Sequence, residues 1–67
     1  MALLRVKEIK NMKPEERVQK MKELRDELMR ERGIAAMGGA PPSPGRIKAL
    51  RTNIARVATV MREEGEL

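Results

Sequence analysis

The residues of this sequence whose types and spacing could do chemistry are five basic side chains, Arg46, Lys48, Arg51, Arg56 and Arg62. No acidic residue lies between Gly33 and Arg62. Guanidinium groups match phosphate oxygens with paired hydrogen bonds, and a nucleic-acid backbone is a line of phosphates. Thr52, Asn53 and Thr59 add hydroxyl and amide groups that bond phosphate or a ribose 2′-OH. An ordinary solvated helix face usually mixes both signs of charge, so this stretch favours contact with RNA or phosphate.

Other kinds of chemistry are excluded by residue types that the chain lacks. It contains no Cys, His, Phe, Tyr or Trp, which removes thiolate nucleophiles and zinc sites, the usual proton shuttle, and stacking platforms for unpaired bases. The carboxylate pairs Glu15-Glu16 and Glu63-Glu64 are neighbours at predicted helix ends and do not form a converging acid/base pair. We therefore expect a binding or structural protein, with no enzymatic activity, cofactor or metal.

Two long amphipathic helices are predicted to position the basic side chains. The first spans 14–32, with Pro14 suited to its first turn and Gly33 to its end, and an apolar stripe of Val18, Met21, Leu24 and Leu28. The second spans 44–64, with Ser43 as its N-cap and Gly65 as its terminator. Its apolar residues step by three and four, which is typical of a helix packed along its length on another; they are Ile47, Leu50, Ile54, Val57 and Met61.

The predicted architecture is all-α, a long antiparallel two-helix hairpin with a short N-terminal helix at about 3–11. The two long helices have matched lengths and are joined by a loop at 33–43 that is rich in Gly, Ala and Pro. The 67 residues form a single domain. No apolar run approaches the ~20 residues of a membrane span. The apolar run at the start of the chain is too short for a signal peptide.

The charges of the first long helix suggest a scaffold. Residues 15–32 carry six basic and six acidic side chains, and Glu16, Glu23 and Glu27 are predicted to face solvent away from the apolar stripe. The arginines that flank the stripe are within reach of a partner at its edge; they are Arg17, Arg25 and Arg32. Met21 and Met61 are expected in the core, which favours a packing role over a methionine-lined peptide site.

Two stretches of the sequence resemble a known protein family. Pro44-Gly45-Arg46-Ile47, followed by the run from Arg51 to Glu63 with Asn53-Ile54-Ala55-Arg56 at its centre, resembles the universal large-subunit ribosomal protein family numbered twenty-nine in bacteria and archaea and thirty-five in eukaryotes. Pro14-Glu15-Glu16-Arg17 also fits, and the resemblance covers essentially the whole chain. The loop looks like the archaeal and eukaryotic branch. Lys13, where relatives have Ser or Thr, and Ala58, where they often have a larger aliphatic residue, depart from the pattern.

The resemblance implies a structural, non-catalytic protein that binds large-subunit rRNA near the exit of the peptide tunnel, in the cytoplasm. It also implies a neighbouring ribosomal protein of family twenty-three, and a rim where targeting or chaperone factors dock. Carried onto this sequence, the rRNA-contacting positions are Arg46, Arg51, Thr52, Asn53, Arg56 and Arg62. A second tier of contacts is Arg5, Lys7 and Lys10.

Two alternatives remain open from the residues alone. The seven-residue period of the second helix supports equally a helical protein–protein adaptor or a coiled-coil dimer without nucleic acid. A small DNA-compacting protein is also compatible with the net charge of +5. The alternatives differ in their salt dependence and in their preference for RNA over duplex DNA.

Overall fold

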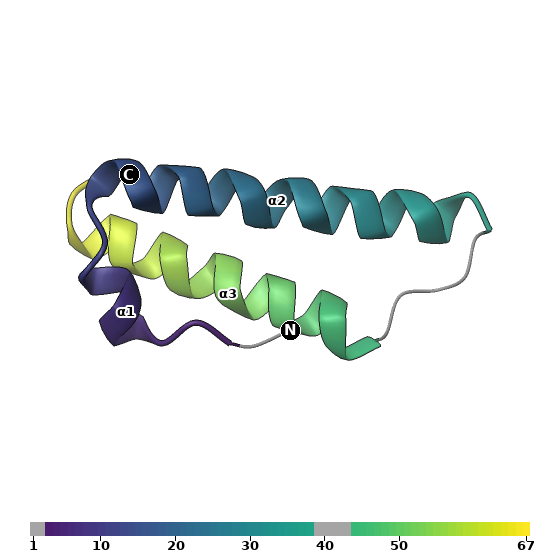
Figure 1. Ribbon diagram of the computed structural model, residues 1–67, viewed down its shortest axis with the longest axis horizontal. Helices are drawn as coiled ribbons and strands as arrows, with labels where there is room; N and C mark the ends of the chain where they lie inside the picture. The colour runs from purple at the N-terminus through teal and green to yellow at the C-terminus, as the bar shows by residue number, and fades with distance from the viewer. Residues whose placement is uncertain (1–2, 39–43) are drawn as a thin grey trace.

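Three helices make up the computed structural model, which describes residues 3–38 and 44–67. They are α1 (Val6–Lys10), α2 (Pro14–Ala36) and α3 (Pro44–Glu63). Helices α2 and α3 run antiparallel, side by side, and α1 lies against α3 near the end where α2 begins (Figure 1). The described residues contain no strand, so the predicted all-α hairpin with a short N-terminal helix is confirmed. The molecule is a rod with extents of 40 × 17 × 14 Å.

Helix α2 begins where the sequence predicts and ends later than it predicts. Pro14 is its first residue, and the N–H of Arg17 donates to the carbonyl of Lys13 at 3.0 Å. The predicted end at Gly33 is wrong, because the helix continues to Ala36 and the N–H of Met37 still donates to the carbonyl of Gly33 at 3.1 Å. A glycine is tolerated inside a helix at modest cost, and the turn that follows has its positive φ of 76° at Gly38. The rest of the predicted loop, 39–43 with the proposed N-cap Ser43, lies outside the described residues.

Replacing Gly33 by alanine is expected to stabilise the fold. The residue lies inside α2 without a positive φ, and a Cβ built on it meets no atom within 4 Å. Alanine restricts the unfolded chain and favours the helix, which is worth about 0.5–1 kcal/mol in a helix interior. Urea unfolding followed by circular dichroism measures the gain, and Gly38→Ala is the matched control, because the φ of 76° makes that substitution unfavourable. An equal or larger gain in the control would contradict the argument.

Helix α3 ends in a Schellman motif, as the predicted terminator Gly65 suggests. Gly65 has a φ of 75°, its N–H donates to the carbonyl of Arg62 at 3.1 Å, and the N–H of Glu66 donates to the carbonyl of Met61 at 2.8 Å. These two bonds satisfy carbonyls that the helix itself leaves free. They also turn the chain so that Glu66 comes to lie against the beginning of α2.

The core lies along the contact between the helices and is closed at one end by α1. Its buried members are Ile9, Met21, Leu24, Leu50, Val57, Val60 and Met61. The predicted core positions of Met21 and Met61 are confirmed. In the predicted stripe of α3, Leu50 and Val57 are fully buried, while Ile47 and Ile54 are half-buried. Ile9 anchors α1 with no exposed surface, and Val60 is equally buried.

One predicted core position in α2 is wrong, and an arginine takes its place. Val18 is 57% exposed, whereas Arg17 is only 5% exposed. Arg17 stands four residues before Met21, which in turn is followed by Leu24, so the buried stripe steps by four and three and begins with the arginine.

The buried guanidinium of Arg17 is fully engaged, so it does not reach outward to a partner as the sequence suggests. Its Nε donates to the carbonyl of Ile9 at 3.0 Å, and Nη2 donates to the carbonyl of Lys10 at 2.8 Å. Nη1 is bonded to the carboxylate of Glu66, whose side chain is 16% exposed. One side chain thus ties the end of α1, the start of α2 and the C-terminal segment together.

Candidate nucleic-acid interface

The outer face of α3 presents three of the cations that the acid-free stretch singles out, Lys48, Arg51 and Arg62. Arg51 and Arg62 are exposed and lie about three turns apart, so they project from the same side of the helix. Lys48 is exposed one turn before Arg51. Between the two arginines this side carries the small residues Ala55 and Ala58, which leave room for a close approach by a backbone. The packed seam of α3 fixes the rotation of the helix, and with it the direction of this row.

The two threonines of α3 bond to the helix that carries them. The hydroxyl of Thr52 donates to the carbonyl of Lys48 at 3.0 Å, and that of Thr59 donates to the carbonyl of Ala55 at 2.8 Å. A hydroxyl that has given its proton away retains oxygen lone pairs for an incoming donor. In this state Thr52 and Thr59 are suited to accept from a ribose 2′-OH and not to donate to phosphate.

Two further predicted site residues, Asn53 and Arg56, hold the N-terminal segment against α3. The N–H of Leu4 donates to Oδ1 of Asn53 at 2.8 Å, and Nη1 of Arg56 donates to the carbonyl of Leu4 at 2.8 Å. Asn53 is only 2% exposed, and Arg56 is half-buried. Because both the N–H and the carbonyl of Leu4 are bound to α3, this segment is fixed. The next residue, the cation Arg5, is therefore positioned beside α3.

Arg46 is committed to ion pairs with α2. Its guanidinium pairs with the carboxylate of Glu27, and its Nε lies 3.1 Å from Oε1 of Glu31. The expectation that Glu27 faces solvent is therefore wrong in part, because the carboxylate is turned toward the start of α3 and is half-buried. The side chain of Arg46 is still 46% exposed.

The second-tier cations lie on α1 and before it. Arg5, Lys7 and Lys10 are all exposed. Lys10 lies 4.0 Å from Glu63 of α3, at the limit of an ion pair, and the pair is open to solvent on both sides. Surface pairs of this kind are weak, so Lys10 is readily released to another anion.

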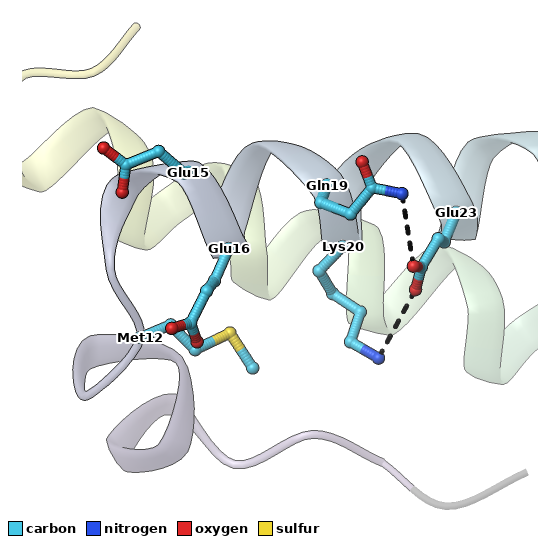
Figure 2. Close-up of a pocket in the computed structure, with 6 residues that line it drawn as sticks. All are labelled: Met12, Glu15, Glu16, Gln19, Lys20 and Glu23. Atoms are coloured by element: carbon cyan, nitrogen blue, oxygen red, sulfur yellow. Dashed lines mark hydrogen bonds and ion pairs between the residues drawn. The ribbon is translucent and has the colours of Figure 1, made fainter.

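A shallow acidic hollow on α2 marks a side of the molecule that repels phosphate. It is lined by Met12, Glu15, Glu16, Gln19, Lys20 and Glu23 (Figure 2). Within it Glu23 accepts from Gln19 at 3.3 Å and lies 3.8 Å from Lys20 (Figure 2). Over the described residues, no group of acidic side chains has the arrangement needed to hold a metal ion.

Besides Lys10 and Thr52, whose contacts are given above, the predicted site residues fall into two groups. Arg51, Arg62, Arg5 and Lys7 are exposed and carry no ion pair among the described residues, whereas Asn53, Arg56 and Arg46 make contacts within the chain. Membrane insertion finds no support in the described part of the chain, where no helix has the length and apolar character of a span.

Comparison with known proteins identifies the family. The family model described as Ribosomal L29 protein matches residues 7–63. The chain is 52% identical over 67 residues to the large ribosomal subunit protein uL29 of Halobacterium salinarum, covering 100% of this chain and 94% of that one. It is 49% identical to the protein of the same name from Haloarcula marismortui, again over 100% of this chain and 94% of the relative. Its identity to the uL29 protein of Thermoplasma volcanium is 49%, covering 91% of this chain and 92% of the relative. The resemblance expected from the sequence is confirmed, and the chain belongs to the ribosomal L29 protein family.

Proposed function

We propose that the chain is a structural protein of the large ribosomal subunit, and that it binds rRNA through the outer face of α3. Its relatives are named large ribosomal subunit proteins, and the family consists of ribosomal proteins and not of enzymes. The observation that carries the RNA-binding part is the exposed row of Arg51 and Arg62, which has no acidic neighbour on its own side of α3. As part of the ribosome the protein acts in the cytoplasm.

The proposed mechanism of rRNA binding depends on cations that the folded protein holds in fixed positions. Folded rRNA brings phosphates close together, and cations placed between its segments replace counterions and relieve their repulsion. Arginines on a rigid helix hold their positions before binding, so less entropy is lost when the contacts form. Recognition then rests on the shape of the RNA and on its 2′-OH groups more than on base edges.

Within this proposal the nine predicted residues have different tasks. Direct phosphate contacts are assigned to Arg51, Arg62, Arg5, Lys7 and Lys10, which are exposed. Arg46 contributes through the exposed part of its guanidinium, and Thr52 through its hydroxyl oxygen. Asn53 and Arg56 contribute by holding the N-terminal segment, and Arg56 is half-buried, so part of its surface still reaches outward.

The position in the particle is also part of the proposal. The family resemblance supports a site at the exit of the peptide tunnel, beside the ribosomal protein of family twenty-three. Targeting or chaperone factors that visit this rim are the other proposed partners. The side chain of Ile34 near the end of α2, which is 39% exposed and not used by the core, is available for protein contacts of this kind.

A coiled-coil dimer is disfavoured by the packing. Leu50 and Val57, the centre of the seam that a dimer would use, are fully buried inside the chain. A dimer through this seam requires the hairpin to open first, which exposes each of these side chains to water at a cost of about 1.5–3 kcal/mol.

Binding of the intact chain to large-subunit rRNA tests the proposed function. The wild type is expected to co-sediment with the large subunit and to bind an rRNA transcript, and Arg51→Gln and Arg62→Gln are each expected to weaken transcript binding about tenfold, by loss of a charge-assisted bond. Arg30→Gln is the matched control, because Arg30 is also an exposed arginine but lies on α2. Wild-type affinity in both α3 variants, or no binding by the wild type, would refute the proposal.

A further inference from the structure

Helix α2 has equal numbers of acidic and basic side chains, but its cations predominate on one side of the helix. From Val18 onward, a stripe that steps by four and three contains no acidic residue, and Glu15 precedes it by one step. All its members are exposed: Val18, Lys22, Arg25, Met29 and Arg32. A second stripe contains the acids Glu16, Glu23, Glu27 and Glu31. At 100° per residue, Arg25 lies about 160° around the helix from Glu27, and Lys22 and Arg32 lie about 140° from it.

The acidic stripe faces the side of the hairpin on which α1 packs. Glu16 and Glu23 line the hollow beside Met12, in the turn that follows α1 (Figure 2). Further along, Glu27 and Glu31 reach Arg46 of α3. The basic stripe of α2 therefore lies on the opposite side of the hairpin, away from α1.

Helix α3 turns its free arginines to the same side. Asn53 marks the α1 side of α3, since it binds the segment that leads into α1. Arg51 lies about 160° and Arg62 about 180° around α3 from Asn53. The cations of both helices thus share one surface, which we call the two-helix basic face; it consists of Lys22, Arg25, Arg32, Arg51 and Arg62.

The dimensions and charge of this face fit a nucleic-acid double helix. Each row is about 15–17 Å long at 1.5 Å per residue, and packed helix axes lie about 8–10 Å apart. All five defining residues are positive; of the nearest acids, Asp26 lies at the outer edge of the α2 row and Glu15 lies before its start. Between the α3 arginines the surface carries the small side chains of Ala55 and Ala58, which project little from the helix. A broad, shallow, positive surface suits the A-form backbone, which proteins recognise by shape and through phosphates and 2′-OH groups.

We propose that the two-helix basic face binds one double-helical segment of rRNA across both helices, so that α2 is an RNA-binding helix and not only a scaffold for α3. This inference rests on the proposed rRNA binding and extends it to α2. The equal numbers of acids and bases in α2 do not show that its cations predominate on one side. The apolar members Val18 and Met29, 57% and 71% exposed, then pack against the sugar edge between phosphate contacts.

The test compares Arg25→Gln with Arg30→Gln in binding to the large-subunit rRNA transcript across a salt series. Both residues are exposed arginines of α2, and only Arg25 belongs to the face. Arg25→Gln is expected to weaken binding about tenfold and to reduce the magnitude of the salt slope by about one, while Arg30→Gln leaves both unchanged. If Arg51→Gln weakens binding but Arg25→Gln matches Arg30→Gln, the two-helix face is overturned and the proposed function stands. If the wild type does not bind rRNA, both fail.

A second measurement separates RNA from a protein occupant. The chain has no cysteine, so Met29→Cys provides a single attachment point for a hydroxyl-radical source in the assembled large subunit. Cleavage of both strands of one rRNA helix is expected from position 29, and weaker cleavage of that helix from Met37→Cys, whose residue is 83% exposed and lies about 12 Å further along, beyond the end of α2. Absence of rRNA cleavage from position 29, or protection of the probe by a neighbouring protein, would overturn the inference.

Discussion

Raising monovalent salt from about 50 to about 200 mM is expected to weaken binding to rRNA about 250-fold if the α3 row and the N-terminal cations act alone. Five exposed cations are assigned direct phosphate contacts, Arg5, Lys7, Lys10, Arg51 and Arg62. Each phosphate neutralised contributes about 0.7–0.9 to the slope of log K against log salt, so five give a slope of about −4. Adding the three cations of α2 steepens the slope to about −6 to −7 and the loss to roughly ten-thousandfold. Filter binding to the rRNA transcript measures the slope.

The same series distinguishes this function from the adaptor and DNA-binding alternatives. Association through an apolar seam responds little to salt, because it involves no counterion release. The oligomeric state of the free chain, followed by sedimentation over the same range, is the control. A slope shallower than −1, or equal affinity for a DNA duplex of the same length, would count against an rRNA-binding surface of this size.

Arg17→Met is expected to destabilise the fold by about 3–5 kcal/mol, the usual cost of removing one partner from a buried ion pair. Methionine keeps much of the buried apolar stem but leaves the carboxylate of Glu66 without its partner and removes the donors to the carbonyls of Ile9 and Lys10. Urea or thermal unfolding followed by helical circular dichroism measures the change, since the chain has no aromatic fluorophore. The expected fall in Tm is about 15 °C or more for a domain of this size.

Two further variants keep this prediction informative where Arg17→Met does not fold. Arg17→Lys retains the charge but not the planar fork that serves three acceptors, so an intermediate loss is expected. Arg30→Met makes the same change at an exposed position of α2 and should alter stability by no more than about 0.5 kcal/mol. Equal effects at positions 17 and 30 would show that the buried guanidinium does not stabilise the fold.

The sequence predicts the long elements well because their signals are local and repeated. Pro14, Pro44 and Gly65 mark helix ends through backbone geometry alone, and the seam of α3 repeats over its length. The end of α2 is predicted less well, because Gly33 permits a left-handed turn without requiring one, and the adjacent alanines favour continuing the helix.

The core of α2 shows where composition misleads. Hydropathy predicts that Val18 is buried, whereas the helical spacing from Met21 and Leu24 places Arg17 in the buried stripe, as the structure shows. An arginine can occupy a core position when carbonyls and a carboxylate surround its guanidinium, and those partners come from residues distant in sequence. No local pattern contains that information, although the phase of the stripe does point to position 17.

The candidate site was predicted from charge, and its internal contacts were not. Acid-free spacing selects Arg51 and Arg62, which are exposed as expected. The same criterion cannot tell that Arg46 pairs with Glu31, or that Arg56 bonds a backbone carbonyl, because both contacts require the tertiary arrangement. The number of charges in α2 likewise does not reveal on which side of the helix the cations predominate. That assignment requires the helical phase and the position of α1.

The bonds at Leu4 have a consequence for how the protein is made. They join residues 49 and 52 positions apart, and the pairing of Arg17 with Glu66 spans 49. A growing chain gains about 5–20 residues per second, so the segment at Leu4 waits about 3–10 s before its acceptor and donor on α3 exist. Its two peptide groups and the guanidinium of Arg17 are hydrated during that interval. The segment at Leu4 and the ion pair of Arg17 are therefore secured late, after α3 and Glu66 have been synthesised.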